Sequence, residues 1–216
     1  MQINCLRNNM KKGKFIVIEG GEGSGKSSLL KALKEKMGDE INITREPGGS
    51  PFGELIRELG LKHPLSKDAD AYTMICLMFA SRFDHFNRLV LPLINKGKHV
   101  ISDRFDTSSY GYQIYGPKAL KVEKIFWNLR ENLPIHPDIY IHIDVDVKEG
   151  LKRAGIRNSK SNEGNRFDDE KVDFHKNVKK GYKKFFNKIP HINIDANRPF
   201  EEVKKDFLKA IDSILN

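Results

Sequence analysis

A glycine-rich segment near the start of the chain carries the residues best suited to phosphate chemistry. Residues 20–27 read GGEGSGKS and satisfy the pattern G-x-x-x-x-G-K-[ST] of a P-loop. In such a loop, backbone N–H groups and a helix N-terminus point at phosphate oxygens, the lysine reaches the β- and γ-phosphates, and the serine hydroxyl binds Mg²⁺. We predict a nucleoside triphosphate site at Gly20, Gly21, Glu22, Gly23, Ser24, Gly25, Lys26, Ser27 and Ser28, with Ser27 as a metal ligand.

Further charged residues follow two short apolar runs. Arg45 and Glu46 lie in TREPGG, and Asp103 and Arg104 lie in DRF. In α/β folds, ligands bind outside the carboxyl ends of parallel strands. Arginine forks bind phosphate oxygens in pairs, and a carboxylate that ends a strand beside the P-loop is placed to bind Mg²⁺ through water. We therefore expect anion-binding arginines at this edge, with Asp103 as a second metal ligand.

The hydrophobic pattern that must position these residues alternates strands with helices. It predicts strands at 14–19, 41–44, 99–103, 138–145 and 191–194, and helices at 26–37, 52–59, 72–96, from 147 onward, 170–187 and 200–215. This alternation indicates an α/β fold: a P-loop NTPase-type parallel sheet of about five strands, flanked by helices on both faces. The polar composition of residues 157–169 predicts a small mobile segment.

Length and composition indicate one domain without a membrane span. With 216 residues and 38% hydrophobic content, the chain can form one well-cored domain, predicted at 14–216, after an N-terminal extension at 1–13. No apolar run approaches the roughly 20 residues needed to cross a bilayer, and the first residues lack the apolar core of a signal peptide. Cys5 and Cys76 match neither a disulfide framework nor a zinc spacing. We expect a cytoplasmic protein.

The formal net charge of +9 favours anionic partners. The lysines are spread along the chain, and no helix-turn-helix, zinc-finger or RNP-like pattern accompanies them. The charge alone indicates only an affinity for anions, such as nucleic acid, acidic lipid or phosphorylated small molecules. We predict neither a nucleic acid substrate nor a membrane partner.

The motifs together resemble the thymidylate kinases, which transfer the γ-phosphoryl group of ATP to dTMP with Mg²⁺. The resemblance runs from about residue 14 to the end and rests on the P-loop, TREPGG, SR, DR-x-x-x-SS-x-x-YQ and DANRP. The bacterial enzymes are the more similar group, because they lack an arginine in the P-loop and supply catalytic arginines from a LID segment. The resemblance implies a LID at about 153–170 and a homodimer formed through the helix predicted at 72–96.

The resemblance also implies residues that bind dTMP. Arg45, Arg57 and Arg104 approach the acceptor phosphate, Glu46 lies near the same edge, and Glu22 binds the 3′-hydroxyl of the acceptor sugar. The remaining residues implied for dTMP are Met78, Arg82, Ser109, Tyr112 and Gln113.

Arg82 is expected to reach the thymine carbonyl, and Gln113 is expected to reach the ring nitrogen of the pyrimidine. Ser109 is expected to reach the phosphate-side loop. Tyr112 is expected to pack under the sugar where a 2′-hydroxyl would lie, which favours deoxyribose. Met78 stands where the family has a phenylalanine that stacks on thymine. Phe79 is adjacent, but neighbouring residues of a helix do not share a face.

For ATP and the LID, the resemblance implies that Arg157 meets the transferring phosphoryl group, with Arg166 as a second candidate. Arg153 flanks the adenine, and Asn197 belongs to the DANRP loop that borders the adenine ring. The predicted catalytic residues are therefore Lys26, Asp103, Arg104 and Arg157.

Other functions stay open at this point. Met78 leaves room for a kinase of another deoxynucleoside monophosphate. The P-loop and the positive charge also fit a nucleic-acid-binding ATPase, whose affinity would drop steeply with salt. A GTP-dependent switch lacks its N-K-x-D motif near a strand end.

Overall fold

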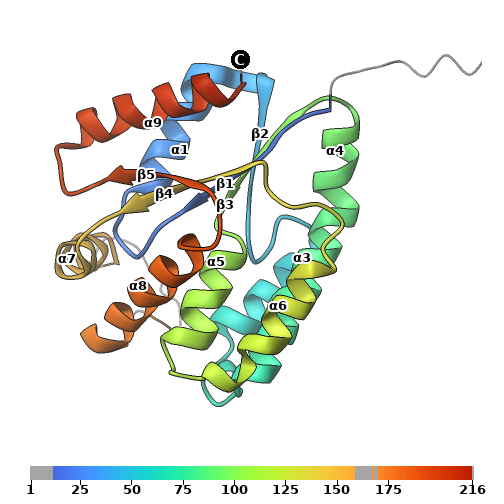
Figure 1. Ribbon diagram of the computed structural model, residues 1–216, viewed down its shortest axis with the longest axis vertical. Coiled ribbons are helices and arrows are strands. Elements are labelled where there is room, and N and C mark those ends of the chain that lie inside the picture. Colours follow the sequence, from blue (N-terminus) through green and yellow to red (C-terminus); the bar gives the residue numbers. More distant parts are fainter. Residues whose placement is uncertain (1–11, 159–166, 168–169, 216) are drawn as a thin grey trace, which may run out of the picture.

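The structure is a computed structural model that describes residues 12–158, 167 and 170–215 (Figure 1). Within these residues the strands form one five-stranded parallel sheet in the order β2-β3-β1-β4-β5. The strands are β1 (Phe15–Glu19), β2 (Ile41–Arg45), β3 (His99–Asp103), β4 (Ile139–Asp144) and β5 (His191–Asp195). The predicted fold class and the predicted strands are thus confirmed.

Helices cover both faces of the sheet, which is why the central strand β1 is buried along its whole length. Phe15 and Val17 belong to one hydrophobic core, and the alternating residues Ile16 and Ile18 belong to the other. This alternation is the two-residue period of a strand with a core on each side. A continuous run of β-branched residues is therefore enough to place β1 in the middle of the sheet.

The helices divide between the two faces, as Figure 1 shows. Helices α1 (Lys26–Met37) and α9 (Phe200–Leu215) pack on the face that carries Ile16 and Ile18. The opposite face carries α3 (Ala71–His85), α4 (Leu91–Asn95), α5 (Asp106–Ser109), α6 (Glu123–Glu131) and α8 (Val172–Phe186). The other helical segments are α2 (Pro51–Arg57), α7 (Val147–Asn158), the π-helical turns η2 (Glu58–Lys62), η4 (Phe86–Val90) and η5 (Tyr110–Tyr115), and the 3₁₀ turns η1 (Gly38–Glu40), η3 (Pro64–Lys67) and η6 (Leu120–Val122).

The long helix predicted at 72–96 is helical throughout but is not one regular α-helix. It consists of α3, the wider turn η4, and α4. Pro92 lies in the first turn of α4, and proline lacks the N–H for an i→i−4 hydrogen bond and clashes with the preceding turn. The π-helical turn absorbs this defect one turn earlier.

Parts of the predicted domain organisation lie outside the described residues. Of the extension predicted at 1–13, the structure describes Lys12 and Gly13, and it describes part of the LID predicted at 153–170. Among the helices of the described residues, none combines the length and the apolar character needed to span a membrane.

Candidate active site

An open cleft runs along the carboxyl edge of the sheet, between the P-loop and α3. Its volume is about 1220 Å³, which exceeds the roughly 300–1,000 Å³ of a site for one small ligand. The P-loop lines one side, TREPGG and DRF form the floor, and α3 and η5 line the other side. The cleft therefore has room for two nucleotides that meet above the sheet edge.

The P-loop takes the backbone shape that phosphate binding requires. Gly23 and Gly25 have φ angles of 66° and 90°, in the left-handed region that glycine tolerates. A Cβ atom on Gly23 would also lie 1.9 Å from the carbonyl oxygen of Gly150. These two glycines let the loop turn back over the N-terminus of α1, where Ser27 and Ser28 are exposed to the cleft.

Lys26 is held under the loop. Its Nζ donates to the carbonyl oxygens of Gly20 at 2.8 Å and Gly21 at 3.2 Å and lies 3.3 Å from Ser24 Oγ. Burial and the nearby charge of Arg104 lower the pKa of Lys26 to about 8, against the opposing effect of Asp103. A bound polyphosphate would replace these carbonyl partners with negative oxygens and raise the pKa of the lysine again.

Asp103 ends β3 beside the P-loop strand, where Ile18 is the partner of Asp103 in the β1–β3 register. Its Oδ1 is buried and has no hydrogen-bond partner among the residues that the structure describes. The same residues contain no cluster of three or more histidine, cysteine or acidic side chains that would hold a metal. A site of one carboxylate and the Ser27 hydroxyl fits Mg²⁺, which is usually held by one or two protein ligands plus substrate phosphates.

Arg104 follows Asp103 and turns its side chain towards the P-loop. Its Nη1 donates to the carbonyl oxygen of Gly20 at 3.1 Å, and its Nη2 donates to Glu22 Oε1 at 2.9 Å. Burial opposes its charge, but Tyr112 and Glu22 outweigh that effect and raise the pKa of Arg104 well above its usual value. Arg104 is therefore a cation fixed beside the P-loop at the end of β3.

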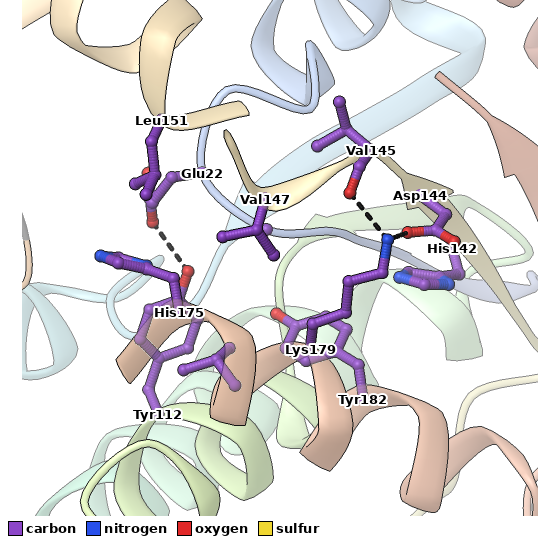
Figure 2. Close-up of a pocket in the computed structure, with 12 residues that line it drawn as sticks. Glu22, Tyr112, His142, Asp144, Val145, Val147, Leu151, His175, Lys179 and Tyr182 are labelled. Carbon is purple, nitrogen blue, oxygen red and sulfur yellow. Dashed lines mark hydrogen bonds and ion pairs between the residues drawn. The ribbon is translucent and has the colours of Figure 1, made fainter. Parts of the chain in front are cut away.

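Glu22 faces away from the phosphate cradle. Its Oε1 also accepts a hydrogen bond from Tyr112 Oη at 2.9 Å, as Figure 2 shows from the side of a smaller pocket behind the loop. Tyr112 comes from η5, which lines the side of the cleft that faces the P-loop. The carboxylate in the P-loop is thus bonded to a residue of the facing side.

Two further arginines gather near Arg104. Arg57 donates to the carbonyl oxygen of Pro47 at 2.9 Å, and Arg45 forms an ion pair with Glu54 at 2.9 Å. Burial lowers the pKa of Arg57, and the positive charges of Arg45 and Arg104 lower it further, against Glu54. The positive charges of these arginines repel one another, and an anion that binds between them would offset this repulsion.

The far side of the cleft is built around Arg82, which is buried between the rings of Phe79 and Phe105, each 4.6 Å from its guanidinium carbon. Arg82 Nε donates to Glu46 Oε2 at 2.7 Å and Nη2 to Ser109 Oγ at 3.1 Å. Nη1 is buried without a hydrogen-bond partner in the described part of the chain. One donor of this fixed fork is therefore left over.

Glu46 was expected to lie near the acceptor, and it borders the cleft, but only 2% of its surface is exposed. Its second oxygen, Oε1, lies 2.9 Å from His85 Nδ1, and His85 Nε2 lies 2.8 Å from Thr44 Oγ1. Glu46 therefore orients Arg82 and His85 from behind the cleft wall.

Met78 and Gln113 line the cleft, as the sequence predicts. Phe79 points into the hydrophobic core, where its ring packs against Phe126 with centroids 5.7 Å apart. Met78 thus lines the cleft and Phe79 does not, and contact between Met78 and the thymine ring stays a prediction.

On the opposite end, Arg153 lines the cleft and donates to the carbonyl oxygen of Ala196 at 3.0 Å. Asn197 is not brought to the cleft, because its Oδ1 accepts from the Asp146 N–H at 2.8 Å and its Nδ2 donates to Asp195 at 2.6 Å. Its neighbours Ala196, Arg198, Pro199 and Phe200 line the cleft instead. Arg166 and the side chain of Arg157 lie outside the described residues.

The sequence analysis did not identify three residues that bond to one another beside the site, namely Glu19, Ser108 and Tyr182. Glu19, at the end of β1, accepts hydrogen bonds from Ser108 Oγ at 2.7 Å and Tyr182 Oη at 3.0 Å. The sequence did contain a signal for Glu19, because this carboxylate ends an apolar strand directly before the P-loop. Nothing in the sequence connects Tyr182 with it, because 163 residues separate the two.

Known proteins resemble this chain in sequence and in fold. The thymidylate kinase family model matches residues 18–207. Among solved structures, a thymidylate kinase from Ehrlichia chaffeensis is similar over 93% of this chain and 99% of that chain, with 25% sequence identity and a TM-score of 0.69. The fold, the P-loop cleft and these matches show that the chain belongs to the thymidylate kinase family and is an enzyme that phosphorylates dTMP to dTDP with ATP.

Proposed function

We propose that ATP lies on the P-loop with its γ-phosphate above Asp103 and Arg104, and that dTMP enters from the side of α3 and η5. The observation that carries this arrangement is the bonding of Glu22, a P-loop residue, to Arg104 and Tyr112 of the opposite side. Glu22 marks the boundary between the two substrates, and its carboxylate would accept a hydrogen bond from the 3′-hydroxyl of the acceptor sugar.

The transfer needs charge neutralisation more than proton chemistry. The acceptor is a phosphate oxyanion, so no general base has to remove a proton before attack. Two polyphosphates repel each other unless cations lie between them. Arg104, with Arg45 and Arg57 beside it, holds the acceptor phosphate, and Lys26 holds the donor. Catalysis then comes from positioning and from fixed charges that meet the transition state.

The metal site belongs to the same edge. Asp103, through its unpartnered Oδ1 among the described residues, and the exposed Ser27 hydroxyl would hold Mg²⁺. An Mg²⁺ ion held by these residues would supply positive charge that neutralises the charge developing on the donor phosphates.

The thymine ring lies between Met78 and the η5 segment. Nη1 of Arg82, which is buried and has no partner among the described residues, would donate to a carbonyl of the base, and Gln113 would reach the ring nitrogen. Tyr112 covers the sugar and favours deoxyribose. Glu46 and Ser109 act through Arg82, since both bond its guanidinium.

At the donor end, Arg153 and the loop 196–200 border the adenine. The LID at about 153–170 supplies Arg157 to the transferring phosphoryl group, with Arg166 as the second candidate. Since Asn197 bonds Asp146 and Asp195, it holds this loop in shape and supports the adenine site without touching it.

The enzyme acts as a homodimer in the cytoplasm. Phe52, Leu55 and Leu59 are 53%, 68% and 48% exposed. Their spacing puts them on one face of the helical run formed by α2 and η2. Thr73, Cys76 and Ala80 are exposed at helical spacing on α3, which packs against α2. Exposed apolar residues gathered on one face favour a protein interface, and Leu55→Glu should give a monomer in sedimentation analysis.

The test of the site assignment is Arg104→Ala with an arginine control. Loss of a fixed cation at the transferring group should lower kcat/KM for dTMP by about 100- to 1,000-fold. Arg88→Ala removes an exposed arginine that pairs with Asp84 on the same helical run and should leave kcat/KM unchanged. Near-normal activity of Arg104→Ala would contradict the proposed arrangement.

A further inference from the structure

The carboxylate of Glu19 is fully buried below the cleft and meets four hydrogen-bond donors. Oε1 accepts from the Phe105 N–H at 2.8 Å and the Ser108 N–H at 3.1 Å. Oε2 accepts from Ser108 Oγ at 2.7 Å and Tyr182 Oη at 3.0 Å. Since no surface of Glu19 is exposed, it cannot touch a substrate, and its effect on the reaction must pass through these partners.

The two hydroxyl groups connect Glu19 with Arg104. Arg104 Nη1 lies 3.2 Å from Ser108 Oγ and 3.4 Å from Tyr182 Oη. A guanidinium group has only donors, so both hydroxyl oxygens accept from Arg104. The two hydroxyl oxygens also lie 2.8 Å from each other, so at least one of the two hydroxyl protons is free to point at Glu19. The bonds thus run in one direction, from the Arg104 cation through two hydroxyls to the Glu19 anion.

The main chain around Arg104 is held by the same carboxylate. Arg104 has a φ of 69°, a left-handed backbone that a residue with a side chain adopts only when its surroundings impose it. Its own N–H donates to the Ile18 carbonyl oxygen at 2.9 Å, and Glu19 binds the N–H groups of Phe105 and Ser108 that follow it. The bonds to β1 therefore hold the turn on both sides of Arg104.

Helix α8 brings Tyr182 to this point and is itself fixed to the sheet. Lys179 forms an ion pair with Asp144 at 2.7 Å and donates to the Val145 carbonyl oxygen at 2.9 Å (Figure 2). Lys179 and Tyr182 are three residues apart and share one face of the helix. The Tyr182 hydroxyl is thereby kept beside Glu19.

We propose that Glu19 is a positioning residue for Arg104, which it holds in the left-handed turn and orients through the Ser108 and Tyr182 hydroxyls. This inference rests on the proposed role of Arg104 as the clamp on the acceptor phosphate. Burial raises the pKa of Glu19 and the charge of Arg104 opposes the rise, which agrees with direct coupling between the two groups.

Glu19→Gln tests the proposal with little change in volume. The Gln amide oxygen can still accept the two N–H bonds, but its N–H₂ group donates to the hydroxyl oxygens that otherwise accept from Arg104. We expect kcat/KM for dTMP to fall about 10- to 100-fold, as for a lost hydrogen bond to a charged group, with KM for ATP within about twofold of wild type.

A double-mutant cycle with Arg104→Ala separates positioning from a general effect on folding. If Glu19 acts through Arg104, Glu19→Gln added to Arg104→Ala changes kcat/KM by less than about twofold. Tyr182→Phe, which removes one hydroxyl, should show a smaller loss that also disappears in the Arg104→Ala background. If urea unfolding shows that Glu19→Gln does not fold, the cycle of Tyr182→Phe with Arg104→Ala tests the proposal instead.

Asp106→Asn is the matched control. Asp106 is equally buried and bonds an arginine and a tyrosine, Arg130 at 2.7 Å and Tyr140 at 2.8 Å, but it does not line the cleft. It should lower stability without lowering kcat/KM. Equal losses for Glu19→Gln with and without Arg104, or no loss in the wild-type background, would overturn the proposal. Near-normal activity of Arg104→Ala alone would instead overturn the role proposed for Arg104.

Discussion

Glu22 and Arg104 form an ion pair between the P-loop and the end of β3, with 2.9 Å between Oε1 and Nη2, although 82 residues separate them in the sequence. A carboxylate in a phosphate-binding loop is unfavourable on its own, because it repels the phosphates. Here Arg104 balances its charge, and Tyr112 bonds the same oxygen. The pair joins the loop proposed to bind the donor to the strand end proposed to meet the acceptor.

Glu22→Gln should weaken acceptor binding selectively. The change keeps the shape of the side chain but removes the charge that Arg104 faces, so the acceptor sugar loses a charged hydrogen-bond acceptor. We expect KM for dTMP to rise about tenfold or more, with little change in KM for ATP, in steady-state assays that vary each substrate. Glu35→Gln, an exposed change on α1, is the control. A rise confined to KM for ATP would show that Glu22 serves the donor.

Glu46→Gln should reduce base selectivity. Gln retains one oxygen but cannot accept from Arg82 and His85 with two equivalent charged oxygens, so the Arg82 fork is held less firmly. We expect the ratio of kcat/KM for dTMP over dCMP to fall about tenfold, because discrimination depends on a fixed donor that meets a carbonyl. Unchanged selectivity with lowered stability would mean that Glu46 only supports the fold.

Met78→Phe should preserve or tighten dTMP binding, because an aromatic ring offers a flat, rigid surface to the thymine where methionine offers a flexible one. Calorimetric titration with dTMP gives the dissociation constant directly. Met74→Phe is the matched control, since Met74 lies one helical turn earlier, is buried and does not line the cleft. A large loss of affinity in Met78→Phe alone would show that the ring does not fit against the base.

ATP binding should depend on pH through Lys26. Burial and Arg104 lower the pKa of this lysine to about 8 in the free enzyme, and bound phosphates raise it again. The complex then holds a proton that the free enzyme has lost, so ATP binding takes up protons near pH 8 and the affinity falls as pH rises above that value.

Calorimetry in buffers of different ionisation enthalpy measures this proton uptake. Lys26→Met should bind ATP more weakly and without the lysine-linked uptake. An ATP affinity of the wild type that stays constant between about pH 7 and pH 9 would contradict the lowered pKa.

The fold could be predicted because its signals are local. The apolar run FIVIE, the glycine loop and the helix that follows are contiguous in the sequence. Apolar runs also mark β3 and β4. The π-helical turn η4 could not be located, since Pro92 shows that a defect exists but not where the helix absorbs it.

The site was predictable where motifs follow strand ends. Lys26, Asp103 and Arg104 fall at the carboxyl edge because every parallel strand ends there. The roles of Glu46 and Asn197 depend on which partners tertiary packing brings, and their hydrogen bonds to Arg82 and Asp146 are not encoded in spacing. The contact between Glu19 and Tyr182 likewise requires α8 to fold back over the sheet.

The central claim is that this cleft transfers phosphate from ATP to dTMP in preference to other nucleotides. The most direct measurement is kcat/KM of the purified enzyme with ATP and Mg²⁺ for dTMP, dUMP, dGMP, dCMP and dAMP. The Arg82 donor, the cleft wall at Met78 and the bonded pair of Glu22 and Tyr112 predict that dTMP has the highest value. A higher value for any of the other four would contradict the account.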